Sequence, residues 1–235
     1  MLVIVASRTD SHAQLLAERW TTRDARLLTS RDLSTKGWSH RLDNGSAATA
    51  AVVNGCTIAS EQITGVLTCV PAITEDELPN VVADDRPFVA AEMTALLIAW
   101  LSSLTCPVVN RPTPASLMGP GWYPEQWLRA ASDVGIPTCP IRRRVRRNGE
   151  EPLTSGQRDF VAVTVVGDAY FGDADPKLGD RARQLAKAAG VDLLTVHFLD
   201  RGPDARLATA ELAVDISRPE IADAILEHFA RGPRC

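Results

Sequence analysis

The stretch DFVAVTVVGDAYFGD, Asp159 to Asp173, places two runs of β-prone residues on either side of Gly167 and Asp168. Valine, threonine and aromatic residues favour strands, and Gly-Asp is a turn sequence, so the stretch predicts a β-hairpin. A capped helix over 175–190 follows, before a strand over 191–200. This order of elements predicts an α+β lobe in the C-terminal half of the chain.

The N-terminal half alternates strands and helices. A strand in MLVIVAS precedes a helix that begins near Ser11, and a buried strand over 63–70 precedes a long helix over 88–104. Such alternation predicts an open, mostly parallel sheet, and therefore an α/β fold class. We place the first domain at residues 1–112 and the second at 113–235.

The composition excludes several classes of protein. The 235 residues are 45% hydrophobic and 23% charged, as in soluble globular proteins. The formal net charge of -4 gives no general attraction to nucleic acid or to anionic membranes. The N-terminus lacks a signal-peptide pattern, and the longest apolar stretch, Phe88–Leu104, contains Glu92 and Thr94. We expect a cytoplasmic protein without a membrane segment.

The cysteines predict neither disulfides nor a metal site. Five are scattered along the chain, at Cys56, Cys69, Cys106, Cys139 and Cys235. They form no CxxC pair and have no histidine at metal-ligand spacing, so we expect reduced thiols and no metal. The chain also lacks a glycine-rich phosphate loop, a nucleophile elbow and a kinase signature, and on these grounds we predict no cofactor.

The order of elements resembles that of the ATP-grasp carboxylate–amine ligases, especially those that act on peptides and on ribosomal-protein termini. Three segments carry the resemblance: GCTIASEQITGVLTCVP, CPVVNRPTPASLMGPGWYPEQWLRAASDVGIPTCP, and the region from the hairpin to ELAVDISRPEIADAI. The resemblance implies a pre-ATP-grasp-like domain with an open, mostly parallel sheet, followed by a truncated ATP-grasp-like α+β lobe.

The residues depart from those of an active ligase where the resemblance implies contacts with ATP and Mg²⁺. Such catalysis needs cationic side chains on the phosphates and acidic or amide ligands for Mg²⁺. No lysine lies near Pro124, and the arginine expected before the hairpin falls on or beside Ala162. The acidic position of the next strand falls on His197, and the terminal Glu-x-Asn set falls on Asp215 and Ser217.

The chain is also too short for the central lid of such a ligase. Residues 141–158 form a basic junction at this place, and fewer than twenty residues cannot supply several strands and a helix. The junction contains the arginine run Arg142, Arg143, Arg144, Arg146 and Arg147. By composition the run suits nucleic acid, but it is short, lacks interleaved aromatic residues and is followed by two glutamates, which favours a solvated junction.

Two predicted parallel strands end in polar residues, at MLVIVASRTD and at VVNR. Open α/β sheets bind ligands at the edge where their parallel strands end, the carboxyl edge. An arginine at this edge can bind a carboxylate or a phosphate. The same residues also have a purely structural explanation. Those after the first strand can form a helix-capping loop, and those after the other strand can form a turn that the asparagine stabilises. The candidate ligand-binding residues, with two from the second lobe, are Ser7, Arg8, Asn110, Arg111, His197 and Asp215.

Trp122, Tyr123 and Trp127 lie close together in a chain that is only 5% aromatic. They can floor a pocket, contact a partner protein or pack a helix against the second lobe, and packing is favoured. His197 and His228 are more readily explained as a core or helix-end histidine than as a catalytic base. The sequence therefore assigns no catalytic residue.

Three functional hypotheses follow, in this order. The first is an ATP-grasp-like protein that has lost ligase activity and serves as an accessory or partner subunit in a biosynthetic or peptide-modifying pathway. The second is an enzyme with other chemistry in the crevice between the lobes, acting on a small carboxylate or a peptide. The third is a nucleic-acid binder through Arg142–Arg147. We expect a homo- or hetero-oligomer, a peptide or small carboxylate ligand, and neither nucleic acid nor membrane as a partner.

Overall fold

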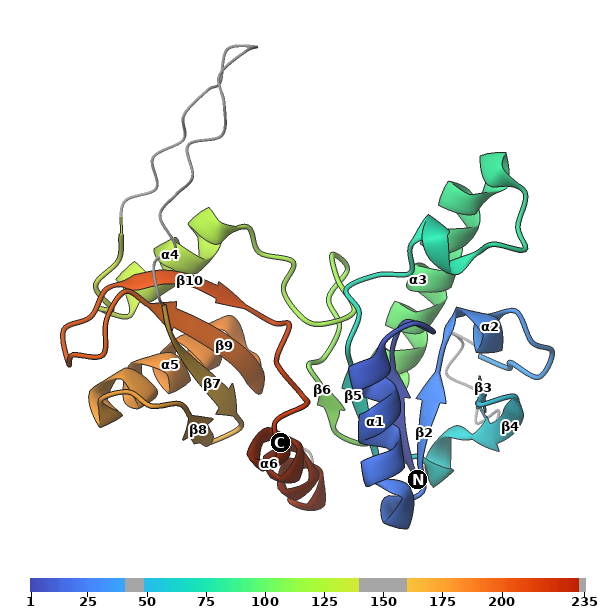
Figure 1. Ribbon diagram of the computed structural model, residues 1–235. Helices are drawn as coiled ribbons and strands as arrows, with labels where there is room; N and C mark the ends of the chain where they lie inside the picture. Colours follow the sequence, from blue (N-terminus) through green and yellow to red (C-terminus); the bar gives the residue numbers. More distant parts are fainter. Residues whose placement is uncertain (41–48, 140–159, 233–235) are drawn as a thin grey trace. The chain divides into compact units, whose positions relative to one another are not determined.

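The computed structural model describes residues 1–40, 49–139 and 160–232. Their contacts divide the chain into two compact units, Met1–Gly121 with Asp215–Cys235, and Trp122–Val214. Figure 1 shows the elements of both units, and each unit is described by itself. The predicted basic junction and its arginine run lie outside the described residues.

A four-stranded parallel sheet forms the centre of the first unit, with the strand order β2-β1-β5-β6. The strands are β1 (Leu2–Val5), β2 (Ala25–Leu28), β5 (Gly65–Thr68) and β6 (Val108–Val109). β1 and β5 are buried along their whole lengths, as expected for a parallel sheet covered on both faces. The sheet confirms the expected α/β class for this part of the chain.

The helices of the first unit follow from their caps and apolar residues. They are α1 (Ser11–Arg19), the short α2 (Ser30–Leu33), α3 (Arg86–Ser103) and α6 (Pro219–Ala230). Asp10 caps α1, because its carboxylate accepts hydrogen bonds from the amides of His12 and Ala13, each at 3.0 Å. Arg218 occupies the N-cap position of α6, and its side chain makes no capping hydrogen bond.

The core of the first unit lies between the sheet and α3. Trp100 of α3 is fully buried there, and its ring meets the ring of Trp38 edge to face, with centroids 5.5 Å apart. A small hairpin of β3 (Ala50–Val53) and β4 (Cys56–Ala59) adds to this core. Asn54 and Gly55 form its turn with φ of 50° and 73°, the positive values that a two-residue turn of this type requires.

The C-terminal helix α6 packs on the first unit. A Cβ added at Gly65 of β5 would lie 2.8 Å from the ring of Phe229, so only glycine allows this approach. The ring of Phe229 also meets that of Trp20 edge to face, at 6.4 Å between centroids. The compact units thus place residues 215–235 with the first part of the chain. Compact units need not coincide with domains, so the boundary at residue 112 stays a prediction.

The second unit is an antiparallel sheet with both of its helices on one face. The strand order is β10-β9-β7-β8. The strands are β7 (Val161–Val166), β8 (Ala169–Phe171), β9 (Leu193–Phe198) and β10 (Leu207–Glu211), and the helices are α4 (Pro124–Asp133) and α5 (Pro176–Ala189). β7 and β8 confirm the predicted hairpin, with Gly167 in the turn at φ 57°.

Alternation along the strands gives this sheet one apolar and one polar face. Val163, Val165 and Val196 pack with α4 and α5 in a single core. The residues between them on the strands face the other way. This second face, which we call the polar face, carries Ala162, Thr164, Thr195, His197, Thr209 and Glu211, together with the buried apolar residues Val166 and Leu193 at its end. Among the described helices, none combines the length and apolar character needed to cross a membrane.

Candidate functional site

The carboxyl edge of the parallel sheet gathers hydroxyl groups around the carboxylate of Glu77. Ser7 follows β1 and donates a hydrogen bond from Oγ to Glu77 Oε1. Ser30 follows β2, and its Oγ lies 3.0 Å from the Glu77 carbonyl oxygen and 3.3 Å from Oε2. The amide of Arg8 also reaches Oε2, at 3.4 Å. Glu77 therefore ties together the ends of two neighbouring strands.

The same edge carries a second carboxylate, that of Asp10, which accepts from the first amides of α1. A bound anion would need these amides, and it would also face the charge of Glu77. The guanidinium of Arg8 is exposed and makes no ion pair with any described residue. The geometry around α1 consequently suits a hydroxyl or ammonium group better than a phosphate.

Cys69 follows β5 at this edge, and its thiol is protonated at neutral pH. Burial, and to a smaller extent the negative charge of Asp10, raises the pKa of the Cys69 thiol to about 12. The thiolate is the nucleophilic form of cysteine, so Cys69 is a partly buried, unreactive thiol rather than a nucleophile.

We predict that iodoacetamide modifies Cys69 on the order of 10³-fold more slowly than an ordinary cysteine, because a pKa of about 12 leaves so little thiolate at pH 7.5. Mass spectrometry of time points, with the exposed Cys56 as the internal control, measures this difference. Equal labelling of the two thiols in the folded protein would contradict the burial of Cys69.

The other candidates of the first unit follow β6 or precede α6. Asn110 and Arg111 end β6, two strands from β1, where Asn110 is buried and Arg111 is exposed. Asp215 accepts hydrogen bonds from the amide and hydroxyl of Ser217. The Ser217 hydroxyl holds the pKa of the Asp215 carboxyl below its ordinary value, and the charge of His12 lowers that pKa further. Ser7, Arg8, Asn110 and Arg111 thus share one edge of the sheet.

His197 lies on the polar face of the second unit. Its Nε2 is 2.7 Å from Oε1 of Glu211, and its ring meets Phe160 edge to face. Ala162 pairs with His197 across β7 and β9, and its methyl offers no polar atom to a ligand. Beside them the hydroxyls of Thr164 and Thr195 hydrogen bond to each other at 3.1 Å. The pair of His197 and Glu211 can exchange protons or orient a polar ligand.

The three aromatic candidates have different environments. Trp127 is buried in the core of the second unit, and Trp122 packs against it edge to face, with centroids 4.8 Å apart. Tyr123 begins α4 and is 73% exposed. The two tryptophans therefore hold α4 to its own sheet, while Tyr123 alone presents an aromatic ring to solvent.

Sequence reasoning missed Glu77, Ser30 and Glu211. The segment TEDELP reads as three solvated acidic residues, and nothing in it distinguishes Glu77 from its neighbours. Glu211 is two positions from Thr209 on β10, so both side chains lie on the same face of the sheet. Because β10 pairs with β9, this alternation could have indicated that Glu211 lies near His197. Within the described ranges, no group of three or more histidine, cysteine or acidic residues could hold a metal ion.

Comparisons with known proteins identify the fold. Three solved structures match the chain almost end to end. The RiPP-associated ATP-grasp ligase of Chryseobacterium gregarium, solved with ADP and a leader and core peptide, matches with a TM-score of 0.67 and 10% identity over 99% of this chain and 97% of its own. The macrocyclase MdnC of Microcystis aeruginosa, bound to the precursor peptide MdnA, matches with a TM-score of 0.66 and 11% identity over 98% and 99%.

The chain has an ATP-grasp-like fold. A RimK domain ATP-grasp protein of Sphaerobacter thermophilus matches too, with a TM-score of 0.52 and 16% identity over 96% of this chain and 99% of its own. No family model and no curated protein matches the sequence. The ATP-grasp-like fold agrees with the resemblance in the sequence, and at such low identities it says nothing by itself about activity.

Proposed function

We propose that this protein has lost ATP-dependent ligation and acts as an accessory or partner subunit in a peptide-modification pathway. The similar structures support the pathway, because two of them are peptide-modifying proteins solved with their precursor peptides. The loss of ligation is our inference from the residues of this chain. As a partner subunit, the protein would form a homo- or hetero-oligomer and contact a peptide.

One observation carries the proposed loss: at the positions where the resemblance implies phosphate and Mg²⁺ contacts, the side chains supply no phosphate-binding cation and only one carboxylate. Ala162 ends in a methyl group. His197 is hydrogen bonded to Glu211, and an imidazole is a poor ligand for Mg²⁺, which prefers oxygen. Asp215 retains one carboxylate, which its own Ser217 hydrogen bonds. These residues do not fit Mg-ATP.

The proposal predicts that the purified protein releases no ADP from Mg-ATP above the rate without protein, whether or not peptides or small carboxylates are added. The physical reason is that the positions at which the resemblance implies a phosphate-binding cation and a Mg²⁺ ligand hold Ala162 and His197, which cannot neutralise the charge of the transferred phosphoryl group. A coupled ADP assay measures the rate. Peptide-dependent release that falls in a His197→Gln variant would belong to this chain and would contradict the proposal; release that stays the same in the variant identifies a contaminant.

A second candidate is an enzyme that uses the polar face for other chemistry on a peptide or a small carboxylate. The pair of His197 and Glu211 favours this candidate, because a carboxylate beside an imidazole fixes its tautomer and supports proton transfer. It predicts turnover that needs no ATP and that His197→Gln removes. The other candidate residues, Arg8, Asn110, Arg111 and Asp215, belong to the first unit.

A further inference from the structure

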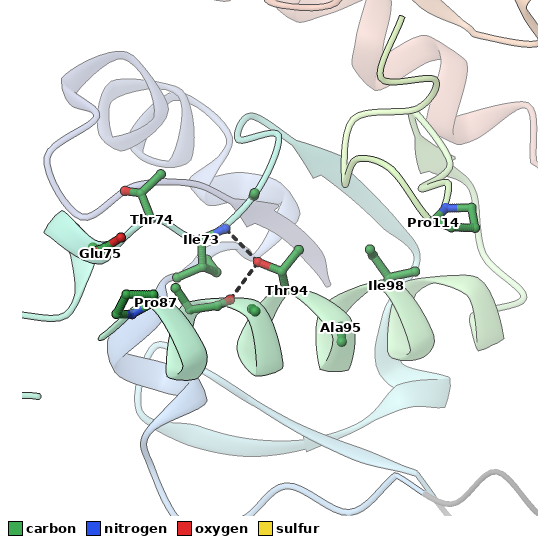
Figure 2. A pocket seen from close by; sticks show the side chains of 11 residues that line it. Ile73, Thr74, Glu75, Pro87, Thr94, Ala95, Ile98 and Pro114 are labelled. Carbon is green, nitrogen blue, oxygen red and sulfur yellow. Dashed lines mark hydrogen bonds between the residues drawn. The ribbon is translucent and has the colours of Figure 1, made fainter. Parts of the chain in front are cut away.

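A groove of about 520 Å³ runs along α3 in the first unit. Figure 2 shows α3 on one side of it and the loop of residues 72–75 on the other. Pro87 and Glu75 lie at one end, and Ile98 and Pro114 lie at the other. The groove is thus an elongated feature of the surface, distinct from the cluster around Glu77.

The groove offers apolar contact and no free polar group on its floor. Ala91 and Ala95 are exposed and small, so they leave room above the helix. The hydroxyl of Thr94 accepts a hydrogen bond from the amide of Ile73 at 3.0 Å and donates one to the Ala90 carbonyl at 2.9 Å. Because that hydroxyl is already paired, the floor suits apolar side chains rather than a polar ligand.

α3 has more apolar surface than its own unit covers. Of its 18 residues only Arg86 and Glu92 are charged, and the apolar residues lie on all sides of the helix. Helices of this kind are normally buried on all sides. Here Leu97 and Trp100 are buried, whereas Phe88 is 69% exposed. The groove thus lies along a helix that exposes apolar surface, and exposed apolar surface of this kind is typical of a protein-binding site.

The charges around the groove favour one kind of partner. Glu75 lines the groove, and residues 72–98, the segment that supplies every lining residue except Pro114, contain six carboxylates and one arginine, a net charge of -5 in a chain whose formal net charge is only -4. The guanidinium of Arg86 donates hydrogen bonds to two backbone carbonyl oxygens, those of Val81 at 2.9 Å and Pro79 at 3.3 Å. None of these carboxylates makes an ion pair with a described residue, although Glu77 accepts hydrogen bonds from Ser7 and Ser30; the other five are Glu75, Asp76, Asp84, Asp85 and Glu92.

We propose that the groove binds a peptide segment of a partner chain that carries apolar side chains next to lysine or arginine. The apolar side chains of the peptide would fill the space above Ala91 and Ala95. Its lysine or arginine side chains would pair with Glu75 and the other carboxylates of residues 72–98. The same carboxylates repel nucleic acid and anionic lipid. The choice of a peptide partner rests on the proposed function, but the groove, its charge and its test involve no nucleotide.

The test measures the anisotropy of a fluorescent twelve-residue peptide of leucine, alanine and lysine during titration with the full-length protein. An otherwise identical peptide with glutamate in place of lysine is the charge control. We expect the lysine peptide to bind at least about tenfold more tightly than the glutamate peptide, and to lose affinity in high salt because the charges are exposed.

Two matched variants locate the site. Ala95→Arg places a long cation in the groove, and we expect it to weaken binding by about tenfold or more. Ser102→Arg adds the same charge to the exposed surface of α3, about one turn beyond Ile98, the last residue of the helix that lines the groove, and should change binding by less than about twofold. Ala91→Arg serves as the second groove variant if Ala95→Arg lowers the melting temperature.

Three results would overturn the inference: no saturable binding of the lysine peptide, equal binding of the two peptides, or equal weakening by the groove and control variants. Each leaves the assay of ADP release untouched. Conversely, ATP turnover would refute the loss of ligation without changing what the peptide titration measures. Failure of the groove and failure of the proposed function are therefore distinguishable.

Discussion

Replacing Trp100 by alanine should lower the free energy of unfolding of the first unit by about 3–5 kcal/mol. Its side chain is 0% exposed, packs edge to face with Trp38 and donates from its indole nitrogen to Ser60 Oγ at 3.4 Å. Alanine would remove this burial and leave a cavity in a core that cannot collapse fully. Denaturation in urea, followed by circular dichroism, measures the loss.

Phe88→Ala is the control for Trp100→Ala, because both residues are large, apolar and on α3, while Phe88 is 69% exposed. Its effect should be within about 0.5 kcal/mol. Equal losses of unfolding free energy in the two variants would show that α3 is not packed on the sheet through Trp100. They would also remove the distinction between the buried face of α3 and the groove.

Replacing Phe229 by alanine should cost about 3–5 kcal/mol and loosen α6 from the sheet. The ring is 7% exposed and fills the space that Gly65 leaves on β5. Limited proteolysis near the C-terminus, together with urea denaturation, measures both effects. The ion pair between Arg19 and Asp223 also joins α6 to α1, but both side chains are largely exposed, so Asp223→Asn should cost no more than about 1 kcal/mol.

A double-mutant cycle sharpens this second prediction. Gly65→Ala alone should destabilise the protein, since the new Cβ would lie 2.8 Å from the Phe229 ring. In the Phe229→Ala background the ring is gone, so the same substitution should cost less. Additive costs would mean that the two residues do not touch, and that α6 is not held at this position.

The elements of the fold were predictable because local patterns determine them. The hairpin turn at Asn54-Gly55, the stop of α5 at Gly190 and the alternation along β7 and β9 all reside in neighbouring residues. The packing of α6 on the first sheet was not predictable, since it depends on Phe229 meeting Gly65, which lies far away in sequence. No local pattern carries such information.

The candidate sites were predictable only in part, for the same reason. The position of Ser7 after a parallel strand follows from the sequence, but its partner Glu77 comes from a loop seventy residues later. The polar character of β9 at His197 is visible, whereas its pairing with Glu211 requires the register of β10. The groove along α3 forms only where the helix meets the loop after β5. From the sequence alone, the apolar residues of α3 look like those of an ordinary buried helix.

The measurement that tests the loss of ATP-dependent chemistry most directly is the melting temperature of the protein with and without Mg-ATP. A ligand at a hundred times its dissociation constant stabilises a protein by about 2.7 kcal/mol, or about 5–10 °C for a chain of this size. We expect no change at millimolar Mg-ATP. A saturable rise of several degrees that also requires Mg²⁺ would show that the chain binds the nucleotide, and it would contradict the account.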